Sequence, residues 1–399
     1  MTKPRARLVL EDGTVVEGPA FGAEATKFGE LVFNTGMTGY QEALTDPSYH
    51  GQILMLTYPL VGNYGISKDP PAPPGAVSPW LDRHGANESD RIWTWGLVVR
   101  EWARHPSHRA SVKTVDAFLQ ENGIPGIEGI DTRALTIKTR SRGVLRACIT
   151  TEDRLSTEAI LEKVRTMPFP DKENLVADVS VKDVTPVKGR GEGRVALIDT
   201  GVKENIVRNL AKRFGTVYKV PWNASAGDVE ALRPDGIFMS NGPGDPAHPD
   251  ILKHTVPMLR DVMEKYPTQG ICLGHQLLAL AYGLKTYKLK FGHRGANQPV
   301  KNLETGRVYI TSQNHGFAVD PASCPDDVLI TEVNANDGTV EGLRHRKLPV
   351  LSSQYHPEAC PGPKDTEFMF DRFQHWLARG GGAAPTESAD AGFRNVRLA

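Results

Sequence analysis

The chain has 399 residues, enough for two or three domains that each bury a hydrophobic core. Its 47 Lys and Arg residues balance its 47 Asp and Glu residues, so no net charge favours nucleic acid or an anionic membrane as a partner. Its 4 cysteines lack paired spacing, and no apolar run is long enough for a secretion signal or a membrane-spanning helix. We therefore expect a cytoplasmic protein without a disulfide framework.

The first 150 residues are predicted to form a domain whose loops dock a partner. Their loop motifs are rich in Gly, Thr, Asn and Tyr, a composition that suits a polar, close-fitting interface. Turns that merely hold a small β-rich domain together are the alternative. A run of prolines and the stretch that follows it, residues 70–95, predict a Pro-rich surface excursion. The motifs are residues 34–42, 45–49, 58–65 and 129–136.

Residues 151–193 are interpreted as a connecting segment whose last part, 181–193, is a polar, Gly-rich linker. From residue 194 apolar strands alternate with helices, which predicts a doubly wound, mostly parallel sheet with helices on both faces. The strands are expected at residues 194–199, 216–220 and 236–240, and helices at 203–213 and 366–379. This domain should end near residue 380, and residues 381–399 should form a flexible tail. The predicted fold class is thus α/β, with an N-terminal β-rich α/β domain.

The run Gly270-Ile271-Cys272-Leu273-Gly274 has the form of a nucleophile elbow with cysteine in place of serine. A tight turn between a strand and a helix should expose the thiol in a cleft. The helix N-terminus should stabilise a thiolate and hold an oxyanion. Cys272 is therefore the candidate nucleophile.

Metal chemistry is the competing interpretation, because His275 follows Cys272 by three positions. No second Cys/His cluster with ligand spacing accompanies this pair, so we expect no metal. The remaining cysteines, Cys148, Cys324 and Cys360, have no comparable surroundings.

The candidate base is His356, in the sequence Tyr355-His356-Pro357-Glu358 after the apolar residues 348–351. A strand there would deliver His356 to the carboxyl edge of the sheet. Glu358 could orient the imidazole, since both side chains can point to one side of an extended segment. Nucleophile, base and carboxylate together suggest a catalytic triad.

Two further segments should line the same edge, where open α/β sheets bind ligands. Residues 240–246, Ser-Asn-Gly-Pro-Gly-Asp-Pro, follow a predicted strand and let bare backbone approach a ligand. Residues 311–317 follow a predicted strand at 308–310 and offer polar groups around a glycine. Ordinary turns are the alternative for both.

Residues 240–246, 270–276 and 355–358 together resemble the motifs of class I (triad) glutamine amidotransferases, over about residues 194–380. The resemblance implies that Cys272 attacks the side-chain amide of glutamine, releases ammonia and leaves a thioester that water hydrolyses. It implies His356 as general acid and base and Glu358 as its orienting carboxylate. Backbone groups of Gly242 and Leu273 would form the oxyanion hole. The residues implied to hold the amino-acid end of glutamine are Gly244, Gln276, Asn314, Gly316 and Phe317.

The four N-terminal motifs resemble the N-terminal domain of the carbamoyl phosphate synthetase small subunit, which other amidotransferases of this class lack. Ser48 matches a position that reaches the glutamine pocket. The resemblance implies a heterodimer with a large subunit that binds ATP, Mg and bicarbonate, receives ammonia along an enclosed path and makes carbamoyl phosphate for arginine and pyrimidine biosynthesis. This chain has no G-x-x-x-x-G-K-[ST] or G-x-G-x-x-G motif, so we expect no cofactor on it.

Two other functions are open at this point. One is an amidotransferase serving another synthase, or a free-standing hydrolase of glutamyl amides; the N-terminal motifs weigh against it. The other is a catalytically inactive regulatory subunit, which would be expected to lack part of the triad.

Overall fold

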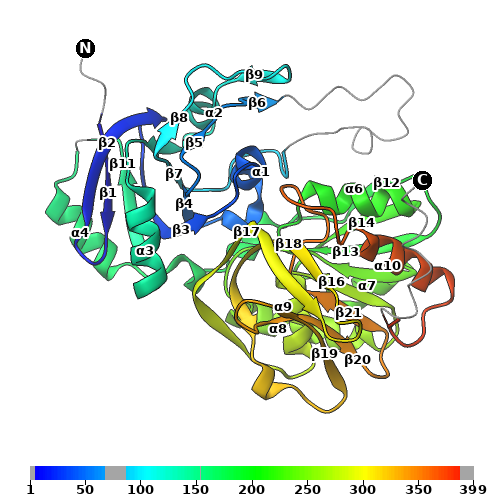
Figure 1. Cartoon of the computed structure of the whole chain (residues 1–399). Coiled ribbons are helices and arrows are strands. Elements are labelled where there is room, and N and C mark those ends of the chain that lie inside the picture. The colour runs from blue at the N-terminus through cyan, green and yellow to red at the C-terminus, as the bar shows by residue number, and fades with distance from the viewer. Residues whose placement is uncertain (1–4, 68–86, 153, 387–399) are drawn as a thin grey trace. The chain divides into compact units, whose positions relative to one another are not determined.

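The computed structural model describes residues 5–67, 87–152 and 154–386 (Figure 1). The chain forms two compact units that divide between Leu175 and Val176. Most of the Pro-rich stretch and residues 387–399 of the expected tail lie outside the described residues. None of the described helices is both long and apolar enough to cross a membrane.

The N-terminal unit is built on a closed barrel in the order β1-β11-β3-β4-β7-β10-β2. Parallel pairs join β3, β4, β7 and β10, and antiparallel pairs complete the circle. The predicted β-rich α/β domain is confirmed. The barrel strands are β1 Arg5–Leu10, β2 Val15–Gly22, β3 Thr26–Asn34, β4 Gln52–Leu56, β7 Gly96–Val98, β10 Pro125–Ile127 and β11 Leu145–Thr150. Short strands outside the barrel are β5 Leu60–Val61, β6 Ile66–Ser67, β8 Glu101–Trp102 and β9 Ser111–Lys113.

Helices cover the barrel, and one of them lies in the predicted connecting segment. Ile160 and Val164 of α4 are fully buried against Val9 and Cys148 of the barrel. The first part of the segment 151–193 is therefore packed structure that belongs to the N-terminal unit. The helices are α1 Tyr40–Thr45, η1 Pro47–Tyr49, α2 Val115–Glu121, α3 Thr132–Arg142, α4 Thr157–Thr166 and η2 Pro170–Lys172, followed by α5 Leu175–Val179 at the division between the units.

The C-terminal unit contains a ten-stranded sheet in the order β12-β14-β13-β15-β16-β21-β20-β19-β17-β18. The strands β14, β13, β15, β16 and β21 are parallel, as predicted. The strands are β12 Thr185–Lys188, β13 Arg194–Asp199, β14 Thr216–Pro221, β15 Gly236–Met239, β16 Thr268–Ile271, β17 Thr286–Asn302, β18 Val308–Val319, β19 Val328–Asn334, β20 Val340–His345 and β21 Val350–Ser353.

Helices cover both faces of the parallel half because its strands are apolar on both sides. Alternate residues of β13 belong to two different cores: Val195 and Leu197 pack with α6 and α10, whereas Ala196 and Ile198 pack with α7, α8 and α9. Figure 1 shows α6 and α10 close together over the sheet. The predicted doubly wound arrangement is confirmed. The helices are α6 Glu204–Arg213, α7 Ala226–Ala231, α8 Pro249–Met263, α9 Leu273–Ala281, η3 Pro321–Ser323 and α10 Phe368–Ala378.

Three local predictions differ from the structure. Residues 185–188 of the expected linker form β12, which pairs with β14 and buries Val187. Residues 311–317, expected just beyond a strand at 308–310, lie inside β18, where pairing with β17 satisfies their backbone. Residues 381–386 of the expected tail fold back, since Nε1 of Trp376 donates to the carbonyl of Gly382 over 3.2 Å and Ala384 is buried.

The aromatic cluster under α10 gives a test of this packing. Phe238 is fully buried, with ring centroids 5.7 Å from Phe370 and 5.4 Å from Phe373. We expect Phe238→Ala to lower the free energy of unfolding of the C-terminal unit by about 3–5 kcal/mol, because it removes a ring and leaves a cavity. Leu252→Ala, at a 42% exposed site on α8, should cost no more than about 0.5 kcal/mol in the same denaturant titration. Equal effects of the two substitutions would contradict this core.

Candidate active site

The backbone at Cys272 forms the predicted elbow between β16 and α9. Cys272 has φ 54° and ψ −106°, a conformation that side chains rarely adopt, and it occupies the N-cap of α9. A Cβ on Gly270 would lie 2.8 Å from the backbone of Gly274, and a Cβ on Gly274 would lie 2.6 Å from Met239. Both glycines are therefore required for the helix to approach the sheet. The strained turn is maintained by close packing on both sides.

The thiol of Cys272 is buried, which corrects the prediction of an exposed nucleophile. Only 2% of the residue is accessible to solvent. Its Sγ lies 3.6 Å from the carbonyl oxygen of Asn314, to which the thiol donates. Asn314, expected just beyond a strand, is part of β18, and its backbone carbonyl reaches the thiol.

His356 comes from the strand next to the elbow. β21 pairs in parallel with β16, so that Ile271 lies opposite Ser353, and the N–H of Cys272 donates to the carbonyl of Ser353 over 2.9 Å. Beyond β21, the N–H of His356 donates to the carbonyl of Ser312 over 2.9 Å. Parallel pairing thus brings together the nucleophile and base that are 84 positions apart in sequence (356 − 272).

Glu358 orients the His356 ring. Nδ1 of His356 donates to Oε1 of Glu358 over 2.6 Å, and both side chains are almost completely buried. The other ring nitrogen, Nε2, is buried and makes no hydrogen bond among the described residues. The histidine is therefore held in one orientation and has one nitrogen available for proton transfer.

The charges around His356 and Glu358 favour the ionised form of both side chains. Burial lowers the pKa of His356, but the negative charges of Glu358 and Cys272 outweigh burial and raise this pKa to about 10. Burial also raises the pKa of Glu358, yet the cation of Lys203 and that of His356 bring it down to about 2. The carboxylate is thus ionised at neutral pH and stabilises a protonated imidazole.

Lys203 is the residue that the sequence analysis missed. Its Nζ lies 3.1 Å from Oε1 of Glu358 and donates to the carbonyl of Ala359 over 2.5 Å, and its side chain is 3% exposed. It is positioned by its own N–H, which donates to Oδ1 of Asn241 over 3.0 Å. The sequence did place Lys203 just after the predicted strand at 194–199, at the sheet edge where the catalytic segments were also expected. A single lysine in a loop has no distinguishing pattern.

The two predicted oxyanion-hole residues are adjacent. A Cβ on Gly242 would lie 1.9 Å from the carbonyl oxygen of Thr200 and 2.8 Å from Cδ2 of Leu273, so only glycine fits beneath the elbow. Leu273 is the first residue of α9, and its N–H therefore has no intrahelical acceptor. Gly244 follows in the same loop at φ +90°, a left-handed conformation that favours glycine.

The other predicted glutamine-binding residues lie on α9 and β18. Gln276 is 3% exposed, and its Nε2 donates to the carbonyl of Phe317 over 2.8 Å and to Oε1 of Gln354 over 2.9 Å. Asn314, Gly316 and Phe317 share β18. The structure therefore brings these four residues together, and Gln354 is an additional partner that the sequence analysis did not identify.

Ser48 lies in the N-terminal unit, in η1 just before β4, and is 5% exposed. Its N–H donates to Oδ1 of Asp46 over 2.9 Å. The predicted contact with glutamine stays a prediction for this residue.

The other reactive side chains considered from sequence have structural surroundings. Nδ1 of His275 lies 2.9 Å from Oγ of Ser352, and burial lowers the pKa of His275 to about 3. Burial raises the pKa of Cys148 to about 12. His275 is therefore a neutral core residue, and Cys148 is an unreactive thiol at neutral pH.

Two family models match the chain. The one described as Glutamine amidotransferase class-I matches residues 196–376, and the one described as Carbamoyl-phosphate synthase small chain, CPSase domain, matches residues 8–149. The C-terminal unit is thus defined as a class I glutamine amidotransferase domain.

Curated relatives resemble the chain over nearly its whole length. The Carbamoyl phosphate synthase small chain of Archaeoglobus fulgidus is 49% identical over 94% of this chain and 99% of its own. The Carbamoyl phosphate synthase small chain of Fusobacterium nucleatum is 50% identical over 92% of this chain and 96% of its own. The Carbamoyl phosphate synthase pyrimidine-specific small chain of Bacillus subtilis is 47% identical over 92% and 95%. The chain belongs to the carbamoyl phosphate synthase small chain family.

The shifted pKa values predict how stability depends on pH. Glu358 contributes stability that is present above its ordinary pKa of 4.5 and lost as pH falls through about 2. His356 contributes stability that is present below its ordinary pKa of 6.5 and lost as pH rises through about 10. We expect Glu358→Gln to lower the melting temperature most between these ordinary values, by an amount that shrinks toward pH 10. Thermal melts across this range would measure it.

Glu304→Gln is the matched control, because Glu304 accepts from Arg344 over 2.6 Å in a less buried ion pair. Its melting curve should run parallel to that of the unmodified protein. A deficit for Glu358→Gln that is constant from pH 5 to pH 10 would contradict the assigned coupling.

Proposed function

We propose that this chain hydrolyses L-glutamine through Cys272 and delivers the ammonia to a large subunit that makes carbamoyl phosphate. The observation that carries the proposal is the assembly of Cys272, His356 and Glu358 at the carboxyl ends of two neighbouring parallel strands. The full triad disfavours an inactive regulatory subunit. Membership of the small chain family disfavours service to an unrelated synthase.

The geometry suggests a sequence of proton transfers. The proton of the Cys272 thiol passes to Nε2 of His356, which gives the pair of thiolate and imidazolium that the raised pKa of His356 favours. The thiolate attacks the amide carbon of glutamine, and the backbone N–H groups of Gly242 and Leu273 stabilise the oxyanion. His356 then protonates the departing nitrogen, which leaves as ammonia, and a glutamyl thioester remains.

Hydrolysis of the thioester completes the cycle. Nε2 of His356, now unprotonated, removes a proton from water, which attacks the thioester carbon and releases glutamate and the thiol. Glu358 stabilises the imidazolium in both halves, and Lys203 keeps this carboxylate ionised. Gly244, Gln276, Asn314, Gly316 and Phe317 are proposed to hold the amino-acid end of the substrate.

The large subunit is proposed to bind ATP, Mg and bicarbonate and to use the ammonia. Support comes from the family and from the lack of phosphate-binding motifs in this sequence. An enclosed route is required, because free ammonia is protonated in water and loses its nucleophilic lone pair. The four free cysteines agree with a cytoplasmic location.

Two of the N-terminal motifs, residues 34–42 and 58–65, form a hydrogen-bonded cluster with an apolar surface, where the sequence analysis expected a polar one. Tyr40 stacks on Tyr64 with centroids 4.1 Å apart and donates to the carbonyl of Gly65 over 2.6 Å. The hydroxyl of Tyr64 accepts from the N–H of Gly39 over 2.7 Å. These contacts fix a shallow pocket whose wall includes Met37, which is 72% exposed. We propose this pocket as part of the docking surface, since exposed apolar side chains beside a hydrogen-bonded backbone suit a stable interface.

Cys272→Ser tests the catalytic assignment. We expect glutamine hydrolysis to fall roughly 10³-fold or more, because serine lacks thiolate character. Synthesis of carbamoyl phosphate from added ammonia by the assembled enzyme should continue. An electrophilic glutamine analogue should modify Cys272 alone among the four cysteines, as mass spectrometry of peptides would report. Unchanged glutaminase activity in Cys272→Ser would refute the proposal.

Met37→Asp tests the docking surface. A charge placed on an apolar contact should weaken association with the large subunit about 10-fold or more, measured by biosensor titration of the purified chains. Val112→Asp is the control, because Val112 is 56% exposed on β9 of the same unit but does not line the pocket. Equal affinities for both variants would exclude this pocket as the interface.

A further inference from the structure

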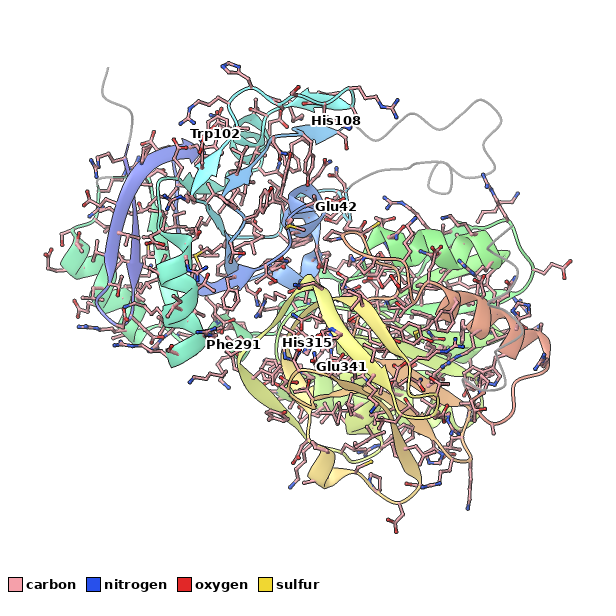
Figure 2. The ribbon with its side chains drawn as sticks, viewed as in Figure 1. Glu42, Trp102, His108, Phe291, His315 and Glu341 are labelled. Carbon is pink, nitrogen blue, oxygen red and sulfur yellow. The ribbon has the colours of Figure 1, made fainter. Side chains whose placement is uncertain are left out.

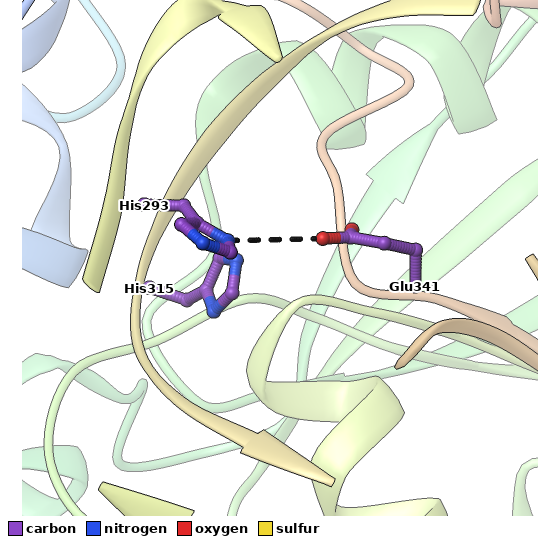
Figure 3. Close-up of side chains that lie close together, drawn as sticks. All are labelled: His293, His315 and Glu341. Atoms are coloured by element: carbon purple, nitrogen blue, oxygen red, sulfur yellow. Dashed lines mark ion pairs between the residues drawn. The ribbon is translucent and has the colours of Figure 1, made fainter. Parts of the chain in front are cut away.

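A second cluster of ligand-type side chains lies in the antiparallel half of the C-terminal sheet. His293 of β17, His315 of β18 and Glu341 of β20 offer ligand atoms that all lie within 4.8 Å of one another (Figure 3). Their exposed fractions are 9%, 5% and 0%. Figure 2 shows His315 and Glu341 close together within this unit. The triad uses none of these residues.

Each histidine has one ring nitrogen held by a partner outside the cluster. Nε2 of His293 lies 2.9 Å from Oδ2 of Asp337, and Nδ1 of His315 lies 2.8 Å from the carbonyl oxygen of Phe317. Metal-bound histidines almost always donate their second N–H to a carboxylate or a backbone carbonyl in this way. These hydrogen bonds turn Nδ1 of His293 and Nε2 of His315 toward the cluster, where Nε2 of His315 also lies 3.0 Å from Oε1 of Gln313.

Two atoms inside the cluster are buried without any hydrogen-bond partner among the described residues. They are Nδ1 of His293 and Oε2 of Glu341. The other oxygen of Glu341, Oε1, lies 3.8 Å from Nδ1 of His293, too far for a hydrogen bond (Figure 3). A buried polar atom without a partner is unfavourable, so such atoms call for an explanation. A cation between these atoms would satisfy both.

We propose that His293, His315 and Glu341 form a binding site for a divalent transition-metal ion of the zinc class. Two imidazoles and one carboxylate are a common ligand set for zinc, and imidazole also suits copper, nickel and iron. Oε1 of Gln313, 3.0 Å from Nε2 of His315, supplies a further neutral oxygen. Ligands of a tetrahedral zinc ion stand about 3.3 Å apart, given bonds of roughly 2.0–2.1 Å, so the three side chains must close slightly around the ion.

The site would link three strands, of which β20 pairs directly with neither β17 nor β18. One of them, β18, contains Asn314, the residue directly before His315. The carbonyl of Asn314 contacts the thiol of Cys272. The ion is therefore structural: it holds the wall of the candidate active site and takes no part in bond breaking. The proposal is independent of glutamine hydrolysis, and its test does not depend on activity.

The experiment is a zinc titration of the full chain. The protein carries Cys272→Ser, which removes a thiol that could bind zinc with His356, and any purification tag is removed. After treatment with a chelator, zinc is added in competition with a chromogenic chelator, and melting temperature is followed in parallel. We expect one equivalent of tightly bound zinc and a higher melting temperature. Cobalt in place of zinc should give the visible absorption of a four-coordinate ion.

Variants of the ligands decide the location. His293→Gln and Glu341→Gln should each weaken zinc binding by about 100-fold or more, and Asp337→Asn, which keeps all three ligands, by about 10–100-fold. His345→Gln is the matched control. The ring of His345 is also buried and lies 3.2 Å from Asp327, but its Nδ1 accepts from two backbone N–H groups and cannot bind an ion.

The outcomes are distinct. Lack of saturable zinc binding by the Cys272→Ser protein would overturn the proposal, and so would unchanged affinity in Glu341→Gln and Asp337→Asn. Those two variants are nearly isosteric with the native residues, so they decide the question even if His293→Gln fails to fold, which circular dichroism would detect. A loss of zinc affinity in His345→Gln as large as that in Glu341→Gln would also refute the site.

Discussion

The parallel pairing of β16 with β21 is the constraint on which the candidate site depends. It places Ile271 opposite Ser353, so that the residues just beyond each strand, Cys272 and the segment leading to His356, leave the sheet at one edge. A register shift of a single residue would turn alternate side chains to the opposite face. The glycines on either side of Cys272 allow α9 to approach closely enough to keep this register. Tight packing and hydrogen bonding, rather than a flexible loop, therefore determine where the thiol lies.

Electrostatics dominates the interior behind this edge. A buried carboxylate is costly unless cations or hydrogen bonds compensate for lost hydration. Glu358 has two cationic neighbours, Lys203 and the imidazole of His356, and its pKa falls accordingly. Glu341 is equally buried; burial and the negative charges of Glu332 and Asp337 raise its pKa well above its usual range, against hydrogen bonds from Asn334 and Gln313. The C-terminal unit thus holds two buried carboxyl groups, Glu358 and Glu341, whose pKa values are shifted in opposite directions, and only Glu358 has cations arranged around it for acid–base chemistry.

Much of the parallel half could be predicted from sequence because its signals are local. The apolar runs at residues 194–199 and 236–240 and the glycines around Cys272 each specify their own conformation. The errors arose where distant partners decide the outcome. Residues 311–317 are polar yet form a strand because β17 pairs with them, and the thiol is covered by that same strand. Lys203, and the cluster around Glu341, depend on contacts between segments that no spacing pattern relates. Hydrophobic periodicity in the sequence therefore does not reveal charge pairs between distant segments.

The order of the strands also affects synthesis of the protein. β21 begins at Val350, 79 positions after β16 ends at Ile271, and it inserts between β16 and β20. A chain still growing on the ribosome therefore has Cys272 without its neighbouring strand, without His356 and without Glu358. The barrel of the first unit needs only residues up to Thr150, since β11 closes it against β1 and β3. Domains generally fold as units in order of synthesis. The first unit can thus be complete while the thiol has no base, and a nascent chain cannot hydrolyse glutamine before β21 and the segment beyond it have been made.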